Sequence, residues 1–270
     1  MTLKTIEWKN NSVIMIDQTK LPNSLEYVTY TDYNQVADAI RTLVVRGAPA
    51  IGISGAFGLA LAVLQSDAKE KDQLIQDLET AQKILLKTRP TAVNLAWGLE
   101  KIMSVAKSEK TVEQIRVSIV EVAKQMAEDD IQINMSIGKN GSDLFSKNDT
   151  IMTHCNAGAL ATVGYGTALG VIRAAKESGK NIKVIATETR PVQQGSRLTA
   201  FELKHDGIDV SLIPDISSGG VISKAGLMTS IPSGAVLLSP IPVTSLAFLC
   251  SIITSSGLLS RSNVDNGAAT

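Results

Sequence analysis

The spacing of apolar residues divides the first 140 positions into a short β region followed by helices. Apolar stretches at 13–16 and 25–30, on either side of the turn-like residues 20–24, predict two strands. Asp32 and Gln35 have the spacing of a capping box, and the apolar residues after them lie on one helical face. Helical spacing predicts further helices through residue 64, around 74–85, over 91–105 and from 111 to about 135.

The pattern changes at the polar residues 141–149, which predict a domain boundary. Short apolar segments then alternate with helical ones, and this alternation predicts a parallel, doubly wound sheet. The predicted strands and helices are 150–153, 167–178, 182–187, 196–204 and 210–213. Ligands bind beyond the carboxyl ends of such strands, which here are followed by 153–158 and 187–194. The fold class is therefore α/β, with a mainly helical N-terminal domain that has a short β start (1–143) and a Rossmann-like parallel-sheet domain (144–215).

Composition changes again after residue 215. From residue 216 to 270 the only charged residues are Lys224, Arg261 and Asp265, and no helical period is visible, which argues against an ordinary helix there. We expect 216–270 to be an atypical tail that truncates or alters the sheet domain and leaves an unpaired strand edge. A shifted reading frame would explain such a tail, and a natural, divergent end is the alternative.

Charge and cysteine content exclude several classes of protein. Lys plus Arg and Asp plus Glu each number 26, so the sequence gives no reason to expect a nucleic acid or an anionic membrane as partner. Hydroxyl residues interrupt the apolar stretch 243–259, which argues against a membrane span. Cys155 and Cys250 are the only cysteines, and the first residues carry no apolar leader, so a cytoplasmic location is expected.

Two segments carry cations beside a helix start. In Arg46-Gly47-Ala48-Pro49-Ala50-Ile51-Gly52, Arg46 offers a forked pair of donors, and the following helix start offers free N–H groups to a phosphate ester. The alternative is a tight turn with a surface arginine. Lys87 and Arg89 precede another helix start, where capping of the preceding helix by these cations is the alternative.

Other candidates follow the predicted strands. Cys155 lies after the first of them, where a nearby cation would favour its reactive thiolate form, although a buried, inert cysteine is equally compatible. Glu188 and Arg190 follow the second strand, where they either hold ligand groups or form a structural ion pair. His154 and His205 lack metal-ligand spacing, so no metal site is predicted.

Taken together, four segments resemble the methylthioribose-1-phosphate isomerases in order and spacing. The resemblance covers about residues 1–215, and the segments are Arg46–Gly52, Thr88–Asn94, Thr153–Leu169 and Glu188–Leu203. These enzymes belong to a wider family with ribose-1,5-bisphosphate isomerases and the regulatory subunits of translation initiation factor two-B. The N-terminal helical domain and the RGAPAIG motif favour the methylthioribose enzyme over both relatives.

The resemblance implies an activity and a set of site residues. The expected reaction converts S-methyl-5-thio-α-D-ribose 1-phosphate to S-methyl-5-thio-D-ribulose 1-phosphate in methionine salvage, without an organic cofactor or a metal, in a homodimer. Cys155 matches the active-site cysteine of these enzymes. The positions that match substrate-contacting residues are Arg46, Gly47, Ala48, Arg89 and Gln194.

One expected group is missing from the sequence. These enzymes also have an Asp in a G-A-D-R motif, and the spacing from Gln194 places Val236 where that Asp is expected. An Asn-Lys pair that usually follows is also absent. A catalytically inactive binding or regulatory relative is therefore one alternative to the methylthioribose-1-phosphate isomerase. A ribose-1,5-bisphosphate isomerase is the other.

Overall fold

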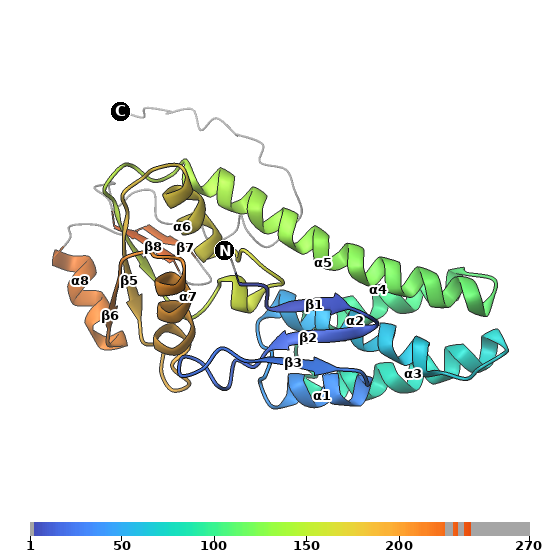
Figure 1. Ribbon diagram of the computed structural model, residues 1–270. Helices are drawn as coiled ribbons and strands as arrows, with labels where there is room; N and C mark the ends of the chain where they lie inside the picture. The colour runs from blue at the N-terminus through green and yellow to red at the C-terminus, as the bar shows by residue number, and fades with distance from the viewer. Residues whose placement is uncertain (1–2, 225–228, 232–234, 239–270) are drawn as a thin grey trace, which may run out of the picture.

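The computed structural model describes residues 3–224, 229–231 and 235–238 and shows two lobes joined by one long helix (Figure 1). The N-terminal lobe begins with a three-stranded antiparallel sheet of β1 (Ile6–Lys9), β2 (Ser12–Ile16) and β3 (Tyr27–Tyr30). The strands predicted at 13–16 and 25–30 are thus confirmed, whereas β1 was not delimited. It has only four residues, too few to show an alternating pattern.

Five helices follow the sheet, and their starts agree with the sequence signals. Both predicted capping boxes form, at Asp32 and at Thr111. The last helix continues to Ser142, seven residues beyond the predicted end near residue 135, because its C-terminal part packs on the second lobe. The helices are α1 (Tyr33–Arg41), α2 (Ala48–Gln65), α3 (Lys71–Thr88), α4 (Val93–Ser108) and α5 (Val112–Ser142).

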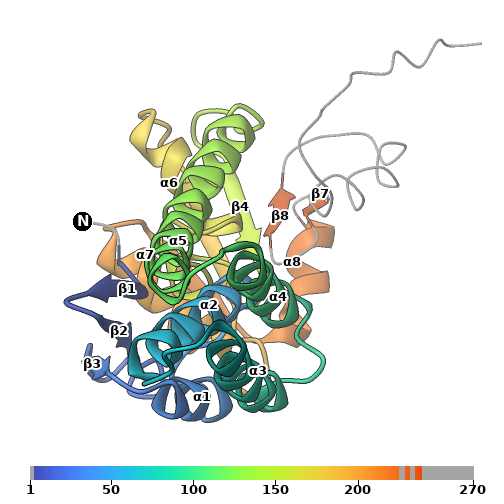
Figure 2. The ribbon, with the colours of Figure 1, turned by 90° about the vertical axis from the view of Figure 1, so that its right-hand side faces the viewer.

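Helix α2 forms the core of this lobe. It is apolar on all sides, and by length and composition alone it could cross a membrane, but 78% of the apolar window is buried inside the protein. It packs against α1, α3, α4 and α5, which surround it in Figure 2. A Cβ on Gly98 of α4 would lie 2.4 Å from the carbonyl oxygen of Gly52. Glycine therefore lets the two backbones touch and brings the start of α4 beside the start of α2.

The second lobe is built on a five-stranded sheet in the order β6-β5-β4-β8-β7. Strands β4 (Thr150–Thr153), β5 (Lys183–Thr187) and β6 (Val210–Ile213) are parallel, as predicted. Helix α6 (Ala168–Glu177) packs on α5, and α7 (Ala200–His205) follows a single π-helical turn at Gly195–Thr199.

The end of the sheet has two features that the sequence did not predict. Strand β8 (Ala235–Leu238) pairs with β4 in the antiparallel direction, and β7 (Thr229–Ile231) pairs with β8, so that among the described residues β6 and β7 are the edge strands. A short helix, α8 (Ser218–Lys224), lies where none was predicted. Its seven residues make two turns, which are too few to reveal a helical period.

Asp130 provides a pH-dependent contact between α5 and the second lobe. Its carboxylate accepts a hydrogen bond from the backbone N–H of Val163 at 2.8 Å. Burial raises the pKa of Asp130 from 3.8 to about 6, although this hydrogen bond opposes the shift. Between these two values the folded protein holds a proton that the unfolded chain releases, so the free energy of unfolding falls as the pH rises through this window.

Asp130→Asn is expected to remove the cost of burying a negative charge at this position, while its side-chain oxygen still accepts the hydrogen bond from the backbone N–H of Val163. The variant should exceed the wild type in free energy of unfolding by on the order of 2 kcal/mol at about pH 7.5, and the difference should shrink toward zero at about pH 4. Urea unfolding at both pH values measures it, with Asp129→Asn on the exposed side of α5 as control. An equal difference at both pH values would contradict the assignment.

Candidate active site

The carboxyl ends of β4 and β5 meet in a strained pair of residues. Cys155 (φ 63°) and Thr189 (φ 62°) both adopt the left-handed conformation, which is unfavourable for residues with a side chain and especially for a β-branched one. The backbone N–H of Cys155 donates to Thr189 Oγ1 at 2.8 Å, and the Cys155 carbonyl accepts from Thr199 Oγ1 at 2.6 Å. Such strain persists only where neighbouring contacts hold it, and it is concentrated at functional sites.

Asp215, at the end of β6, holds the loop that carries Thr189. Its two carboxylate oxygens accept hydrogen bonds from the backbone N–H groups of Thr189 and Arg190, each at 2.8 Å. The Arg190 N–H is the main cause that lowers the pKa of Asp215. His154 lies on the same rim, with Nδ1 2.6 Å from Thr187 Oγ1. All three parallel strands therefore contribute to the position of Cys155.

Arg46 reaches the same rim from the other lobe. Its two terminal nitrogens donate to the backbone oxygen and to Oδ1 of Asn156, at 2.9 to 3.2 Å, and its side chain is buried. Gly47, at φ 99°, follows as the N-cap of α2, and a Cβ there would lie 2.4 Å from the carbonyl oxygen of Ala161. This glycine therefore lets the start of α2, with the free N–H groups of its first turn, lie against the sheet domain.

Cys155 and Arg89 both lie within electrostatic range of Arg46. Burial lowers the pKa of Arg46, Cys155 and Glu202 oppose that shift, and the positive charge of Arg89 adds to it. Arg89 is the C-cap of α3, so the alternative of a helix-capping cation remains compatible with its position. Two cations and a thiol thus converge at one end of α2, an arrangement that suits an anionic substrate and proton transfer.

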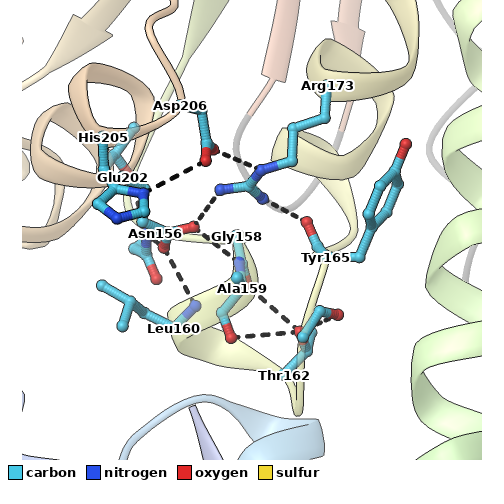
Figure 3. A network of polar contacts seen from close by, with 12 residues as sticks. Asn156, Gly158, Ala159, Leu160, Thr162, Tyr165, Arg173, Glu202, His205 and Asp206 are labelled. Atoms are coloured by element: carbon cyan, nitrogen blue, oxygen red, sulfur yellow. Dashed lines mark hydrogen bonds and ion pairs between the residues drawn. The ribbon is translucent and has the colours of Figure 1, made fainter. Parts of the chain in front are cut away.

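A buried polar network around Glu202 holds the side chain of Asn156 in place (Figure 3). Glu202 is fully buried and accepts hydrogen bonds from Asn156 Nδ2 at 2.8 Å and from the backbone N–H groups of Ala159 and Leu160 at 2.7 and 3.2 Å. Its carboxylate also pairs with Arg173, whose Nη2 lies 2.7 Å away. Arg173 in turn pairs with Asp206 at 2.6 Å. The orientation of Arg46 therefore depends on a chain of contacts that ends in α6 and α7.

Gln194 and Arg46 share the wall of a cavity of about 280 Å³ between the two lobes. The buried Oε1 of Gln194 has no hydrogen-bond partner among the described residues. Cys155, Arg89, Gly47 and Ala48 do not line this cavity, so Arg46 is the residue that connects it to the rest of the site.

An ion pair between Glu188 and Arg190, one of the two alternatives considered for them, is not found among the described residues. Their backbone N–H groups instead bond to Ile213 and Asp215, which fixes the loop through its main chain. Asn156, Thr189 and Glu202 were not predicted as site residues. All three lie inside the segments that resemble the isomerases, but the contacts that give them a role join residues more than 30 positions apart.

The position expected for a catalytic Asp lies on β8. The register places Val236 opposite Met152 and Ala235 opposite Thr153, in the antiparallel direction. Ser233 and Gly234, the start of the expected motif, lie outside the described residues, as does Cys250. Among the described residues, no three His, Cys, Asp or Glu side chains are grouped so that they could hold a metal ion.

Comparison with known sequences places these residues in a family. The profile of the initiation factor 2 subunit family matches residues 44–234, so the resemblance continues beyond residue 215, where the sequence analysis ended it. Methylthioribose-1-phosphate isomerase of Geotalea uraniireducens is 49% identical over 226 residues, 83% of this chain and 65% of its own length. The enzyme of the same name from Geotalea daltonii is 48% identical over 237 residues, 87% of this chain and 68% of its own length. The chain thus spans about two thirds of the curated relatives it matches.

Two solved structures are also similar. One is 5-methylthioribose 1-phosphate isomerase from Pyrococcus horikoshii OT3, with a TM-score of 0.78 and 40% identity over 84% of this chain and 64% of that one. The other is described as translation initiation factor eIF-2B, subunit delta, from A. fulgidus, with a TM-score of 0.77 and 45% identity over 84% of this chain and 66% of that one. Both support the fold of the two lobes as described.

Proposed function

This chain belongs to the initiation factor 2 subunit family, and from that premise we propose that it is an aldose–ketose isomerase of methionine salvage. The substrate is S-methyl-5-thio-α-D-ribose 1-phosphate, and the product is S-methyl-5-thio-D-ribulose 1-phosphate. The observation that carries the proposal is the buried guanidinium of Arg46 beside Cys155 at the start of α2. Curated relatives named for this activity support it.

The proposed roles follow from the chemistry of the reaction. The phosphate stays on the anomeric oxygen throughout the reaction. The C1–O4 bond of the ring must therefore break, with a proton delivered to O4, before C1 can receive hydrogen from C2 and the ketone can form at C2. Arg46, Arg89 and the backbone N–H groups at Gly47 and Ala48 bind the phosphate. Cys155 takes part in moving hydrogen from C2 to C1, either as a general acid–base through an enediol or beside a hydride shift.

Gln194 contacts the sugar in this proposal. Its unpartnered oxygen is an acceptor that a sugar hydroxyl can satisfy. We also propose that the protein works as a cytoplasmic homodimer and uses neither a metal nor an organic cofactor.

Incubation of the purified 270-residue chain with the sugar phosphate tests the proposal, with formation of the ketose followed together with binding. Arg46→Met should weaken substrate binding about 10- to 100-fold, because a charge-assisted contact to phosphate is lost in a buried site. Arg46→Lys should not restore it fully, because the forked contact to Asn156 needs a guanidinium. Arg41→Met on the exposed face of α1 is the control. Absence of both binding and conversion would contradict the proposal.

A binding or regulatory relative is the second candidate, and Val236 at the position of the expected Asp is the observation that favours it. Tight binding without conversion in the same assay would support this candidate. Ribose 1,5-bisphosphate serves as a comparison ligand, and a preference for it would support the sister isomerase instead.

A further inference from the structure

We propose that Asn156 is a positioning residue for the reaction, which holds the two terminal nitrogens of Arg46 so that the Nε edge of the guanidinium faces the phosphate of the substrate. The inference rests on the proposed function and adds a residue that acts through Arg46 and not on the substrate itself. Asn156 lies beyond the end of β4, directly after Cys155, and is only 6% exposed.

Asn156 contacts Arg46 with two oxygens at once. Its backbone oxygen lies 2.9 Å from Nη2 and 3.2 Å from Nη1 of Arg46. Its Oδ1 lies 3.0 Å from Nη1 and 3.2 Å from Nη2. A guanidinium is planar and rigid, so contacts with both terminal nitrogens fix its plane as well as its position. These contacts therefore determine which edge of Arg46 is left for a ligand.

The Nε edge of Arg46 is the one that is left. A guanidinium has five N–H donors, one on Nε and two on each terminal nitrogen. Nε makes no hydrogen bond with any described residue, and it is not one of the enclosed polar atoms that lack a partner, so a ligand can reach it. Together with the outer N–H of the neighbouring nitrogen it forms a fork that matches two oxygens of a phosphate.

The orientation of the Asn156 carboxamide follows from its other neighbours. Its Nδ2 lies 2.8 Å from Oε1 of Glu202 and 3.1 Å from Oγ1 of Thr199. The Thr199 hydroxyl donates to the backbone oxygen of Cys155 at 2.6 Å, so its oxygen is left to accept from Asn156. The reverse orientation would place Oδ1 against a carboxylate and Nδ2 against a guanidinium, which is unfavourable on both sides. Oδ1 therefore faces Arg46.

Asn156 also sets where the guanidinium lies relative to the thiol. Thr199 holds both the carbonyl of Cys155 and the carboxamide of Asn156, and Cys155 lies within electrostatic range of Arg46. A phosphate bound on Arg46 thus keeps the rest of the sugar near Cys155. A side chain that is ordered before the substrate arrives does not have to lose conformational freedom on binding, and this preorganisation strengthens binding.

The test is a double-mutant cycle of Asn156→Ala and Arg46→Met, with the dissociation constant of the sugar phosphate measured by isothermal titration calorimetry. We expect Asn156→Ala to weaken binding roughly fivefold to tenfold when Arg46 is present. In the Arg46→Met background the same change should weaken binding less than about twofold, because no guanidinium is left to position. Asn140→Ala at the exposed end of α5 is the matched control and should leave the affinity unchanged in both backgrounds.

Equal losses in both backgrounds would show that Asn156 supports only the fold, and that result would overturn the inference. Unchanged affinity in Asn156→Ala would overturn it too, because Arg46 would then bind the phosphate without being held. Should Asn156→Ala fail to fold, Asn156→Ser takes its place in the cycle with the same expected non-additivity. Failure of the proposed function looks different, since the wild-type chain itself then does not bind the sugar phosphate and both conclusions fall together.

Discussion

Replacing Cys155 with serine is expected to lower kcat for the sugar phosphate by about 10²- to 10⁴-fold, the range for loss of a group that transfers protons. Serine keeps the size of the side chain and the strained backbone contacts with Thr189 and Thr199, but its hydroxyl is a far weaker acid and base than a thiol. Steady-state kinetics of ketose formation measures the effect. The affinity for substrate should change less than about threefold, because Arg46 rather than Cys155 holds the phosphate in this proposal.

A large loss of kcat with little change in substrate affinity would show that Cys155 acts in the chemical step and not in substrate binding. Cys155→Ala should show a similar loss of kcat, since neither replacement provides a thiol. A serine variant that keeps more than half of the wild-type rate would remove Cys155 from the mechanism. A parallel loss of affinity would instead show that the replacement had disturbed the loop that Thr189 supports.

Replacing Glu202 with leucine is expected to lower the free energy of unfolding by about 3–5 kcal/mol, the cost of breaking a buried ion pair from one side. Arg173 would lose one of its two carboxylate partners, and the N–H groups of Ala159 and Leu160 would lose their acceptor. Since small proteins are stable by only about 5–15 kcal/mol, the effect should be large in urea unfolding.

Glu202→Gln provides a milder test, because glutamine keeps one oxygen acceptor. Its free energy of unfolding should lie between those of the wild type and the leucine variant. Glu121→Leu is the matched control, since Glu121 pairs with Lys124 on the exposed face of α5, where an ion pair contributes at most about 1 kcal/mol. Equal losses for Glu121→Leu and Glu202→Leu would show that burial of the network does not matter.

Local signals explain what the sequence could predict. Asp32 with Gln35, and Thr111 with Gln114, start their helices through contacts three residues apart, so both starts are readable from the chain. The three parallel strands are apolar runs between turn residues, and they too were found. The length of α5 and the direction of β8 depend on packing against other segments, and no local pattern encodes either.

The same distinction between local signals and long-range contacts applies to the site residues. Arg46, Cys155 and Gln194 were identified because they stand in recognisable segments, although their catalytic and binding roles stay predictions. The contact between Arg46 and Asn156 spans 110 positions, and the contact between Asn156 and Glu202 spans 46. Glu202 lies within a predicted helix and looks in sequence like any solvent-facing glutamate. Only the folded chain shows that this carboxylate is enclosed.

The single helix α5 has a mechanical consequence. Its 31 residues extend for roughly 45 Å and pack on α2 in one lobe and on α6 in the other. Because α5 packs against other helices near both of its ends, it could bend as a hinge only by losing backbone hydrogen bonds of its own. We therefore expect the two lobes to keep their relative orientation when a ligand binds, so that the distance between Arg46 on one lobe and Cys155 on the other is set by the fold and not by domain closure.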